Sequence, residues 1–296
     1  MSEGGPTKAI YVMGAGHSGS TILGMTLGNC DGVFFAGEIA RWLRYDGKPR
    51  LPGDERAEFW RGVRAGVEVP EELLGHGARA LEQSSAAFRP LSRIRQRRLR
   101  AGYRRATADI FASIAREAGA SIVVDTSHFP RRARELQDND GVELYLVYVV
   151  RDAQSVIASY GREGVAHKQT WKMSTANAYL WLTYALSLPV FRRQPRERRL
   201  FVRHEDFVAE PDRVVEQILR MAGSEAPVPD LGALRTGLAF QGNRLLRTEQ
   251  TISLRGRPER PQRGSRVTAL VQLPWRGVFA RLRPTTGGTR DAERGA

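Results

Sequence analysis

The segment of residues 9–27, AIYVMGAGHSGSTILGMTL, constrains the fold more than any other part of the sequence. Apolar residues 9–13 predict a short buried strand, the glycine-rich residues 14–19 predict a turn, and residues 20–27 predict the start of a helix. Glycines let the backbone bend close to an oxyanion, and the unpaired N–H groups of a first helical turn point towards it. The sequence therefore predicts an anion-binding site at this turn, which we call the glycine loop (residues 14–19).

The glycine loop fits three classes of ligand site. Residues 14–19, GAGHSG, satisfy the dinucleotide pattern G-x-G-x-x-G, and Glu38 lies roughly where a ribose-binding acid would follow. This favours an NAD(P)-binding oxidoreductase. Residues 14–21 also approach the pattern G-x-x-x-x-G-K-[ST] of a kinase or NTPase, except that Ser20 occupies the lysine position. The third class is a phosphate cradle rich in hydroxyl groups and without that lysine, which Ser18, Gly19, Ser20 and Thr21 would supply.

The composition indicates one globular domain. A chain of 296 residues with 41% hydrophobic residues is long enough for one sizeable α/β domain. Its single cysteine, Cys30, excludes an internal disulfide framework and a cysteine-cluster metal site. No apolar run approaches the length of a membrane span, and residues 1–10 lack the apolar core of a signal peptide. We therefore expect a cytoplasmic protein.

The net charge of +14 calls for an anionic partner or reflects an arginine-rich surface. The excess is concentrated in residues 93–105, in residues 192–199 and from residue 244 onward. A basic module that binds polyanions is therefore an alternative to an enzyme. The sequence has no aromatic-interleaved basic motif, zinc knuckle or recognition-helix pattern, so nucleic acid is disfavoured as the partner.

Strands and helices alternate along the chain, which predicts a mostly parallel five-stranded sheet with helices on both faces and a P-loop-like nucleotide-binding core. The predicted strands are residues 9–13, 33–35, 121–124, 145–150 and 200–203. A helix is predicted over residues 174–188, with Pro189 at its end. Residues 1–283 are expected to form a single domain, and residues 284–296 a disordered tail. Residues 46–90 resemble a helical insertion beside the ligand-binding edge, which makes them a candidate acceptor wall or lid.

Polar, titratable side chains follow two predicted strands. Glu38 comes after residues 33–35, and Asp125, Ser127 and His128 come after residues 121–124. Ligands collect at the carboxyl edge of open parallel sheets, so Glu38 and His128 compete for a catalytic role. Alternatively, Asp125 and Ser127 cap the next helix, and Glu38 begins one.

Arg151 and Ser159 predict a second phosphate site. Residues 144–150, LYLVYVV, are continuously apolar, as in a central parallel strand buried on both faces, and this strand ends at Arg151. Ser159 follows eight positions later, about two helical turns, so the two residues lie on nearly one side of the helix. An arginine fork and a hydroxyl so placed can clasp a phosphate, unless Arg151 instead pairs with Asp152.

In this order and spacing, these segments resemble the sulfotransferases that use 3′-phosphoadenosine-5′-phosphosulfate (PAPS). Residues 17–21, HSGST, resemble the family's [RK]-S-G-[ST]-[ST] loop for the 5′-phosphosulfate, with His17 in place of a basic residue. Residues 151–153, RDA, together with Ser159 resemble the R-D-P strand end and serine for the 3′-phosphate, with Ala153 in place of proline. The branch of bacterial, carbohydrate and tyrosylprotein enzymes also has segments similar to residues 37–38, 125–128, 202–207 and 242–244.

The resemblance covers residues 8–250 and implies in-line transfer of a sulfuryl group from PAPS to a small-molecule or carbohydrate acceptor, leaving 3′,5′-ADP. It implies Glu38 as general base, with His128 as second candidate, and His17 as an aid to the leaving oxygen. No metal is implied, because the transferred group carries little charge compared with a γ-phosphoryl group. The implied nucleotide contacts are Gly16, His17, Ser18, Gly19, Ser20, Thr21, Arg151, Ser159, Asn243 and Arg244.

Overall fold

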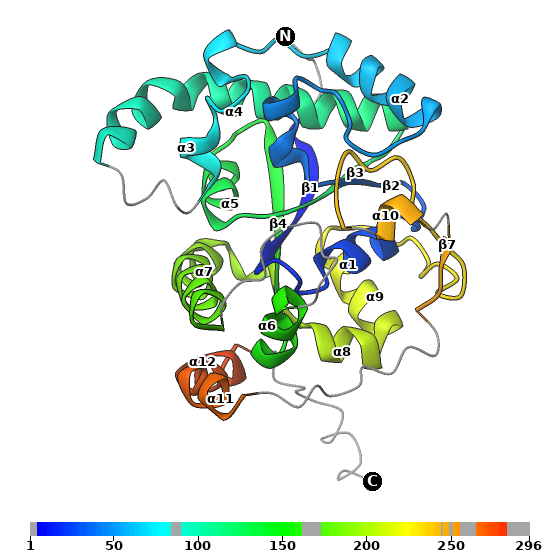
Figure 1. The fold of residues 1–296 in the computed structure, drawn as a ribbon. Coiled ribbons are helices and arrows are strands. Elements are labelled where there is room, and N and C mark those ends of the chain that lie inside the picture. The colour runs from blue at the N-terminus through cyan, green and yellow to red at the C-terminus, as the bar shows by residue number, and fades with distance from the viewer. Residues whose placement is uncertain are drawn as a thin grey trace, which may run out of the picture.

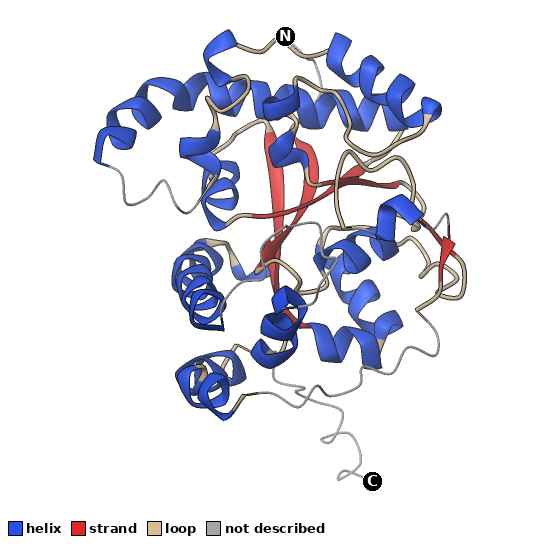
Figure 2. Cartoon of the chain, viewed as in Figure 1, coloured by secondary structure: helices blue, strands red, loops and turns tan. Residues whose placement is uncertain are grey.

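The computed structural model describes residues 5–83, 90–161, 173–243, 245–248, 251–254 and 265–282. Five parallel strands form one sheet in the order β2-β3-β1-β4-β5, drawn in red in Figure 2. The strands are β1 (Thr7–Gly14), β2 (Val33–Gly37), β3 (Ile122–His128), β4 (Val142–Val150) and β5 (Arg199–Arg203). The predicted fold class, a single α/β domain with a five-stranded parallel sheet, is confirmed.

Helices cover both faces of the sheet (Figure 1). One face packs against α2 (Asp54–Ala65), α4 (Pro90–Ala118), α5 (Pro130–Gln137) and α7 (Met173–Arg193). The other face packs against α1 (Ser20–Leu27), α8 (His204–Ala209) and α9 (Pro211–Met221). The remaining elements are η1 (Ile39–Arg41), η2 (Leu43–Tyr45), η3 (Glu71–Leu73), α3 (Arg79–Glu82), α6 (Ala153–Gly161), η5 (Arg196–Arg198), β6 (Leu234–Arg235), α10 (Leu245–Thr248), β7 (Thr251–Ile252), α11 (Arg266–Val271) and α12 (Leu273–Ala280).

Strand β1 shows why the central strands are apolar throughout. Its side chains alternate between the two faces of the sheet, so Tyr11 and Met13 lie in one hydrophobic cluster and Ile10 and Val12 in the other. All four side chains are fully buried. A strand covered by helices on both faces therefore has no position for an exposed polar side chain before its carboxyl end.

Two local predictions are wrong. Asp125 and Ser127 lie within β3 and do not cap α5, because the Asp125 carboxylate accepts hydrogen bonds from both the backbone and the side chain of Ser127. Helix α7 was expected to end at Pro189, yet it continues to Arg193. The extra turn buries Val190 and Phe191 in the core, which offsets the hydrogen bond that the proline cannot donate.

Helices α11 and α12 were not predicted from the arginine- and proline-rich sequence around them. Helix α11 is held to α7 by hydrogen bonds, among them one from Trp181 Nε1 to the Val271 carbonyl, and α12 is anchored by aromatic contacts with the sheet and α7. The Trp275 ring lies 5.5 Å from that of Tyr184, and the Phe279 ring stacks 5.7 Å from that of Phe201. The predicted disordered tail, residues 284–296, lies outside the described residues.

The segment of residues 46–90 contains α2, η3 and α3 in its described part, and Trp60 and Leu73 are fully buried in the core. It is therefore packed onto the domain, and its role as an acceptor wall or lid stays a prediction. None of the helices in the described part of the chain has the length and apolar character needed to cross a membrane.

Candidate active site

The glycine loop turns the chain sharply between β1 and α1. His17 and Gly19 have positive φ angles of 63° and 91°, and helix α1 begins directly afterwards at Ser20. The start of the loop lies against strand β4, since a Cβ atom at Gly14 would be 2.4 Å from the Val149 carbonyl oxygen. The backbone therefore approaches β4 as closely as only glycine allows, which sets where the first amides of α1 point.

Arg151 and Ser159 both contact the glycine loop, although they come from a different part of the chain. The Arg151 Nη1 atom donates to the His17 carbonyl at 3.2 Å. The Ser159 hydroxyl lies 3.1 Å from Nδ1 of the same histidine. The spacing of eight residues therefore does place both side chains beside one loop, as expected for α6 starting just after β4.

A cavity of about 310 Å³ opens beside Arg151. Two further guanidinium groups line it, those of Arg203 at the end of β5 and Arg276 in α12. Aromatic side chains of Tyr184 and Trp275 form part of its wall. Three arginines around an aromatic-lined cavity suit a ligand that is both anionic and planar.

Two tyrosines that the sequence did not single out also hold the glycine loop. The Gly16 amide donates to the Tyr179 hydroxyl at 3.0 Å, so this predicted phosphate-binding amide is already engaged. The Tyr160 ring packs edge-on against His17 at 4.4 Å. Burial and the adjacent Tyr179 raise the pKa of Tyr160, which keeps its hydroxyl protonated. The indication in the sequence that Tyr160 lies near the glycine loop is that it directly follows Ser159 in α6.

The middle of the loop contains a buried hydroxyl and a close backbone approach. The Ser18 side chain is 1% exposed, and its Oγ has no hydrogen-bond partner among the residues that the structure describes. Gly19 lies against His204, because a Cβ atom there would be 2.2 Å from the imidazole Nδ1. An orphaned buried hydroxyl next to the start of a helix is the arrangement expected where an oxyanion binds.

Glu38 lies directly after β2, at the end of the sheet opposite β5. Its carboxylate pairs with Arg41 at 3.1 Å, and its amide donates to the Gln241 carbonyl at 2.8 Å. The next residue along that loop, Gly242, lies close to α1, since a Cβ atom there would be 3.6 Å from Thr21 Cγ2. The loop that contains Asn243 thus runs between Glu38 and the start of α1, and Arg244 lies outside the described residues.

His128 ends β3, the strand between β1 and β2, and pairs in register with Met13 of β1. Its φ angle of 58° is unusual for a residue other than glycine and turns its side chain out of the strand's alternation. Burial lowers the pKa of His128, while the negative charge of Glu38 opposes that effect. The His128 imidazole is therefore neutral near pH 7. The two candidate bases, Glu38 and His128, follow or end the neighbouring strands β2 and β3.

A buried ionic network supports this end of β3. Asp125 is fully buried, and its Oδ2 accepts from Arg132 Nε at 2.9 Å. Arg132 also donates to the Tyr103 hydroxyl at 2.7 Å and pairs with Glu82 at 3.3 Å. The Ser127 hydroxyl accepts from the amide of Ala40 in η1, so the network connects β3 to the turn that follows Glu38.

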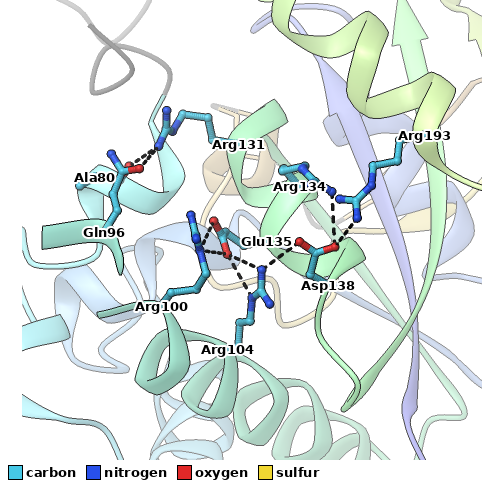
Figure 3. Close-up of polar contacts among 9 residues, drawn as sticks. All are labelled: Ala80, Gln96, Arg100, Arg104, Arg131, Arg134, Glu135, Asp138 and Arg193. Carbon is cyan, nitrogen blue, oxygen red and sulfur yellow. Dashed lines mark hydrogen bonds and ion pairs between the residues drawn. The ribbon is translucent and has the colours of Figure 1, made fainter. Parts of the chain in front are cut away.

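Many arginines of the basic runs are paired within the domain (Figure 3). Arg100 and Arg104 of α4 both lie 3.0 Å from Glu135 of α5. Asp138 pairs with Arg104 and, at 2.7 Å, with Arg193 of α7. These residues connect three helices, so part of the basic charge stabilises the fold and is not an open surface for a polyanion. Among the described residues, no three or more His, Cys, Asp or Glu side chains are grouped so that they could hold a metal ion.

The fold of this chain is similar to that of two solved sulfotransferase domains. The sulfotransferase domain from the Synechococcus PCC 7002 olefin synthase superposes with a TM-score of 0.54 at 19% identity, over 93% of this chain and 97% of that one. The sulfotransferase domain from the curacin biosynthetic pathway superposes with a TM-score of 0.52 at 16% identity, over 92% and 98%. No protein-family model matches the sequence, and a search of curated proteins finds no relative.

Proposed function

We propose that this protein transfers a sulfuryl group from PAPS to a hydroxyl or amine of a small-molecule or carbohydrate acceptor. The observation that carries the proposal is that Arg151 and Ser159 both contact His17 of the glycine loop. Two oxyanion-binding elements side by side fit a nucleotide with phosphates at both its 5′ and 3′ positions. The sulfotransferase fold and the loop without a lysine support the same conclusion.

In this proposal the 5′-phosphate binds at the start of α1. The amide of Gly19, the N-cap of α1, and the amides of Ser20 and Thr21 in its first turn would donate to it. The buried Ser18 hydroxyl, which no described residue engages in a hydrogen bond, would donate to a phosphate oxygen. The 3′-phosphate would bind to Arg151 and Ser159, and the loop that contains Asn243 would contact the nucleotide.

The transfer itself is an in-line displacement at sulfur. The acceptor oxygen forms a bond to sulfur as the bond from sulfur to the 5′-phosphate oxygen breaks, and the acceptor proton moves to Glu38. The loop donors and His17 stabilise the charge that develops on the leaving phosphate. His128 is the alternative base, because its lowered pKa leaves a free nitrogen lone pair near pH 7.

Thermal unfolding of the protein with a panel of nucleotides tests the proposal without knowledge of the acceptor. A ligand at one hundred times its dissociation constant stabilises the folded state by about 2.7 kcal/mol, which raises the melting temperature measurably. We expect stabilisation by 3′,5′-ADP without magnesium, and none of comparable size by ATP with Mg²⁺ or by NADPH.

The same panel identifies the alternatives. Stabilisation by ATP with Mg²⁺ alone would indicate a kinase or NTPase, and stabilisation by NADPH alone an oxidoreductase. A basic polyanion-binding module would instead show no nucleotide preference and a steep loss of heparin or DNA binding with salt. Any of these three outcomes would refute sulfuryl transfer from PAPS.

A further inference from the structure

A small cavity of about 70 Å³ is lined in part by residues that closely follow the two candidate bases, Glu38 and His128, in the chain. Ala40 and Arg41 line one side of it, and both follow Glu38 within three positions. Phe129, the residue after His128, lines another side. Arg79 of α3 belongs to the insertion of residues 46–90 and also lines the cavity. We call this space the basic cavity. Its size suits one small functional group and not a whole acceptor.

Three arginines, Arg41, Arg44 and Arg79, are among the residues that line the basic cavity. Arg41 pairs with Glu38, as described above. Arg79 donates to the neutral Gln83 side chain at 2.6 Å, and Arg44 lies over the Tyr45 ring at 5.3 Å. In the described part of the chain, neither Arg44 nor Arg79 pairs with a carboxylate, so the cavity carries uncompensated positive charge.

Glu82 is the one acidic side chain among the described residues that line the cavity. It does not neutralise Arg44 or Arg79, because it faces the buried network instead. Its carboxylate pairs with Arg132 and accepts from the Tyr103 hydroxyl at 3.1 Å. Burial raises the pKa of Glu82 to about 7, so near neutrality it also carries less than a full negative charge.

We propose that the basic cavity binds an oxyanion on the acceptor, so that the acceptor carries a phosphate, sulfate or carboxylate close to the group that is sulfated. Arginine forks bind such groups with two parallel hydrogen bonds, and two or three forks around a small cavity select an anion over a neutral group. An oxyanion there also competes with Glu38 for Arg41, which frees the carboxylate to accept the acceptor proton. This inference rests on the proposed function, because it assigns the acceptor side of that site.

Isothermal titration calorimetry with inorganic phosphate tests the inference. The protein is first saturated with 3′,5′-ADP, so that phosphate cannot occupy the nucleotide site. We expect one equivalent of phosphate to bind to this complex. The double variant Arg44→Ala, Arg79→Ala should bind phosphate at least about tenfold more weakly. Arg50→Ala is the matched control, because Arg50 lies over the same Tyr45 ring at 4.9 Å but does not line the cavity.

The outcomes distinguish failure of the proposed sulfuryl transfer from failure of the proposed anionic acceptor. If 3′,5′-ADP itself does not bind, the proposed function fails. If 3′,5′-ADP binds and phosphate does not, or if the double variant binds phosphate as tightly as Arg50→Ala does, the anionic acceptor is refuted while sulfuryl transfer stands. Unchanged affinity of all variants for 3′,5′-ADP shows that they are folded. Parallel titrations with sulfate and acetate rank the oxyanion that the cavity prefers.

Discussion

The Ser159 hydroxyl lies 3.1 Å from the His17 imidazole Nδ1, although 142 positions separate the two residues. This contact joins helix α6 to the glycine loop at the residue whose φ angle is 63°. A histidine in the left-handed region is strained, so it needs outside support to stay there. Ser159 and the Tyr160 ring supply part of that support.

Ser159→Ala should therefore weaken nucleotide binding in two ways. It removes the hydroxyl that we propose binds the 3′-phosphate and one contact that holds the loop. We expect affinity for 3′,5′-ADP to fall about tenfold or more, as measured by calorimetry. Ser121→Ala is the control, because it also removes one serine hydrogen bond. Ser121 directly precedes β3, so it lies at the amino ends of the parallel strands, away from the glycine loop. Equal affinities of the two variants would contradict the role of Ser159.

Ser18→Ala should weaken nucleotide binding without lowering the stability of the fold. In the described part of the chain the buried Ser18 hydroxyl has no hydrogen-bond partner, so its removal should leave the free energy of unfolding unchanged or slightly increased. Affinity for 3′,5′-ADP should nevertheless fall about tenfold, because the nucleotide phosphate would lose its hydrogen bond from the Ser18 hydroxyl. Urea denaturation and calorimetry on the same preparation measure both quantities. A variant that loses stability and keeps its affinity would show that the hydroxyl has a structural role only.

Arg132→Met should destabilise the fold strongly. The substitution leaves the fully buried Asp125 carboxylate without its charged partner and removes the pair with Glu82. Breaking a buried ion pair from one side typically costs about 3–5 kcal/mol. The free energy of unfolding from urea denaturation measures the loss. Arg97→Met, an exposed position in α4, is the control and should change stability by less than about 0.5 kcal/mol.

Glu82 should make stability depend on pH. Burial raises its pKa from 4.5 to about 7 in the folded protein. A carboxyl that binds its proton more tightly when folded stabilises fully below its unfolded pKa, and this contribution is lost as pH rises towards 7. The loss is on the order of 3 kcal/mol. The stability of wild type relative to Glu82→Gln should thus fall between pH 4.5 and 7, as urea denaturation at each pH would show. Parallel curves for the two proteins would contradict this.

The sequence was sufficient for the parts of the site that depend on local patterns. The apolar run before Arg151 predicts β4 because a strand buried on both faces leaves no room for polar side chains. The spacing of Arg151 and Ser159 predicts one helix face because α6 begins directly after the strand. The glycines predict the loop because a Cβ atom at Gly14 would clash with β4.

The sequence was insufficient where distant segments meet. Tyr179 accepts from the Gly16 amide across 163 positions, and Arg132 reaches Glu82 across 50. No local period or spacing indicates such pairs, because they depend on how helices pack against the sheet. For the same reason, Arg104 looked like part of a solvated charge run, whereas α5 supplies its partner Glu135.

The most direct test of the proposed nucleotide site is how much the 3′-phosphate adds to the binding affinity of the nucleotide. Calorimetry with 3′,5′-ADP and with 5′-AMP, on wild type and on Arg151→Ala, isolates that contribution. We predict that wild type binds 3′,5′-ADP about one hundredfold more tightly than 5′-AMP, and that Arg151→Ala reduces this preference to within a few-fold. A preference that survives in Arg151→Ala, or no preference in wild type, would contradict the assignment of Arg151 to the 3′-phosphate.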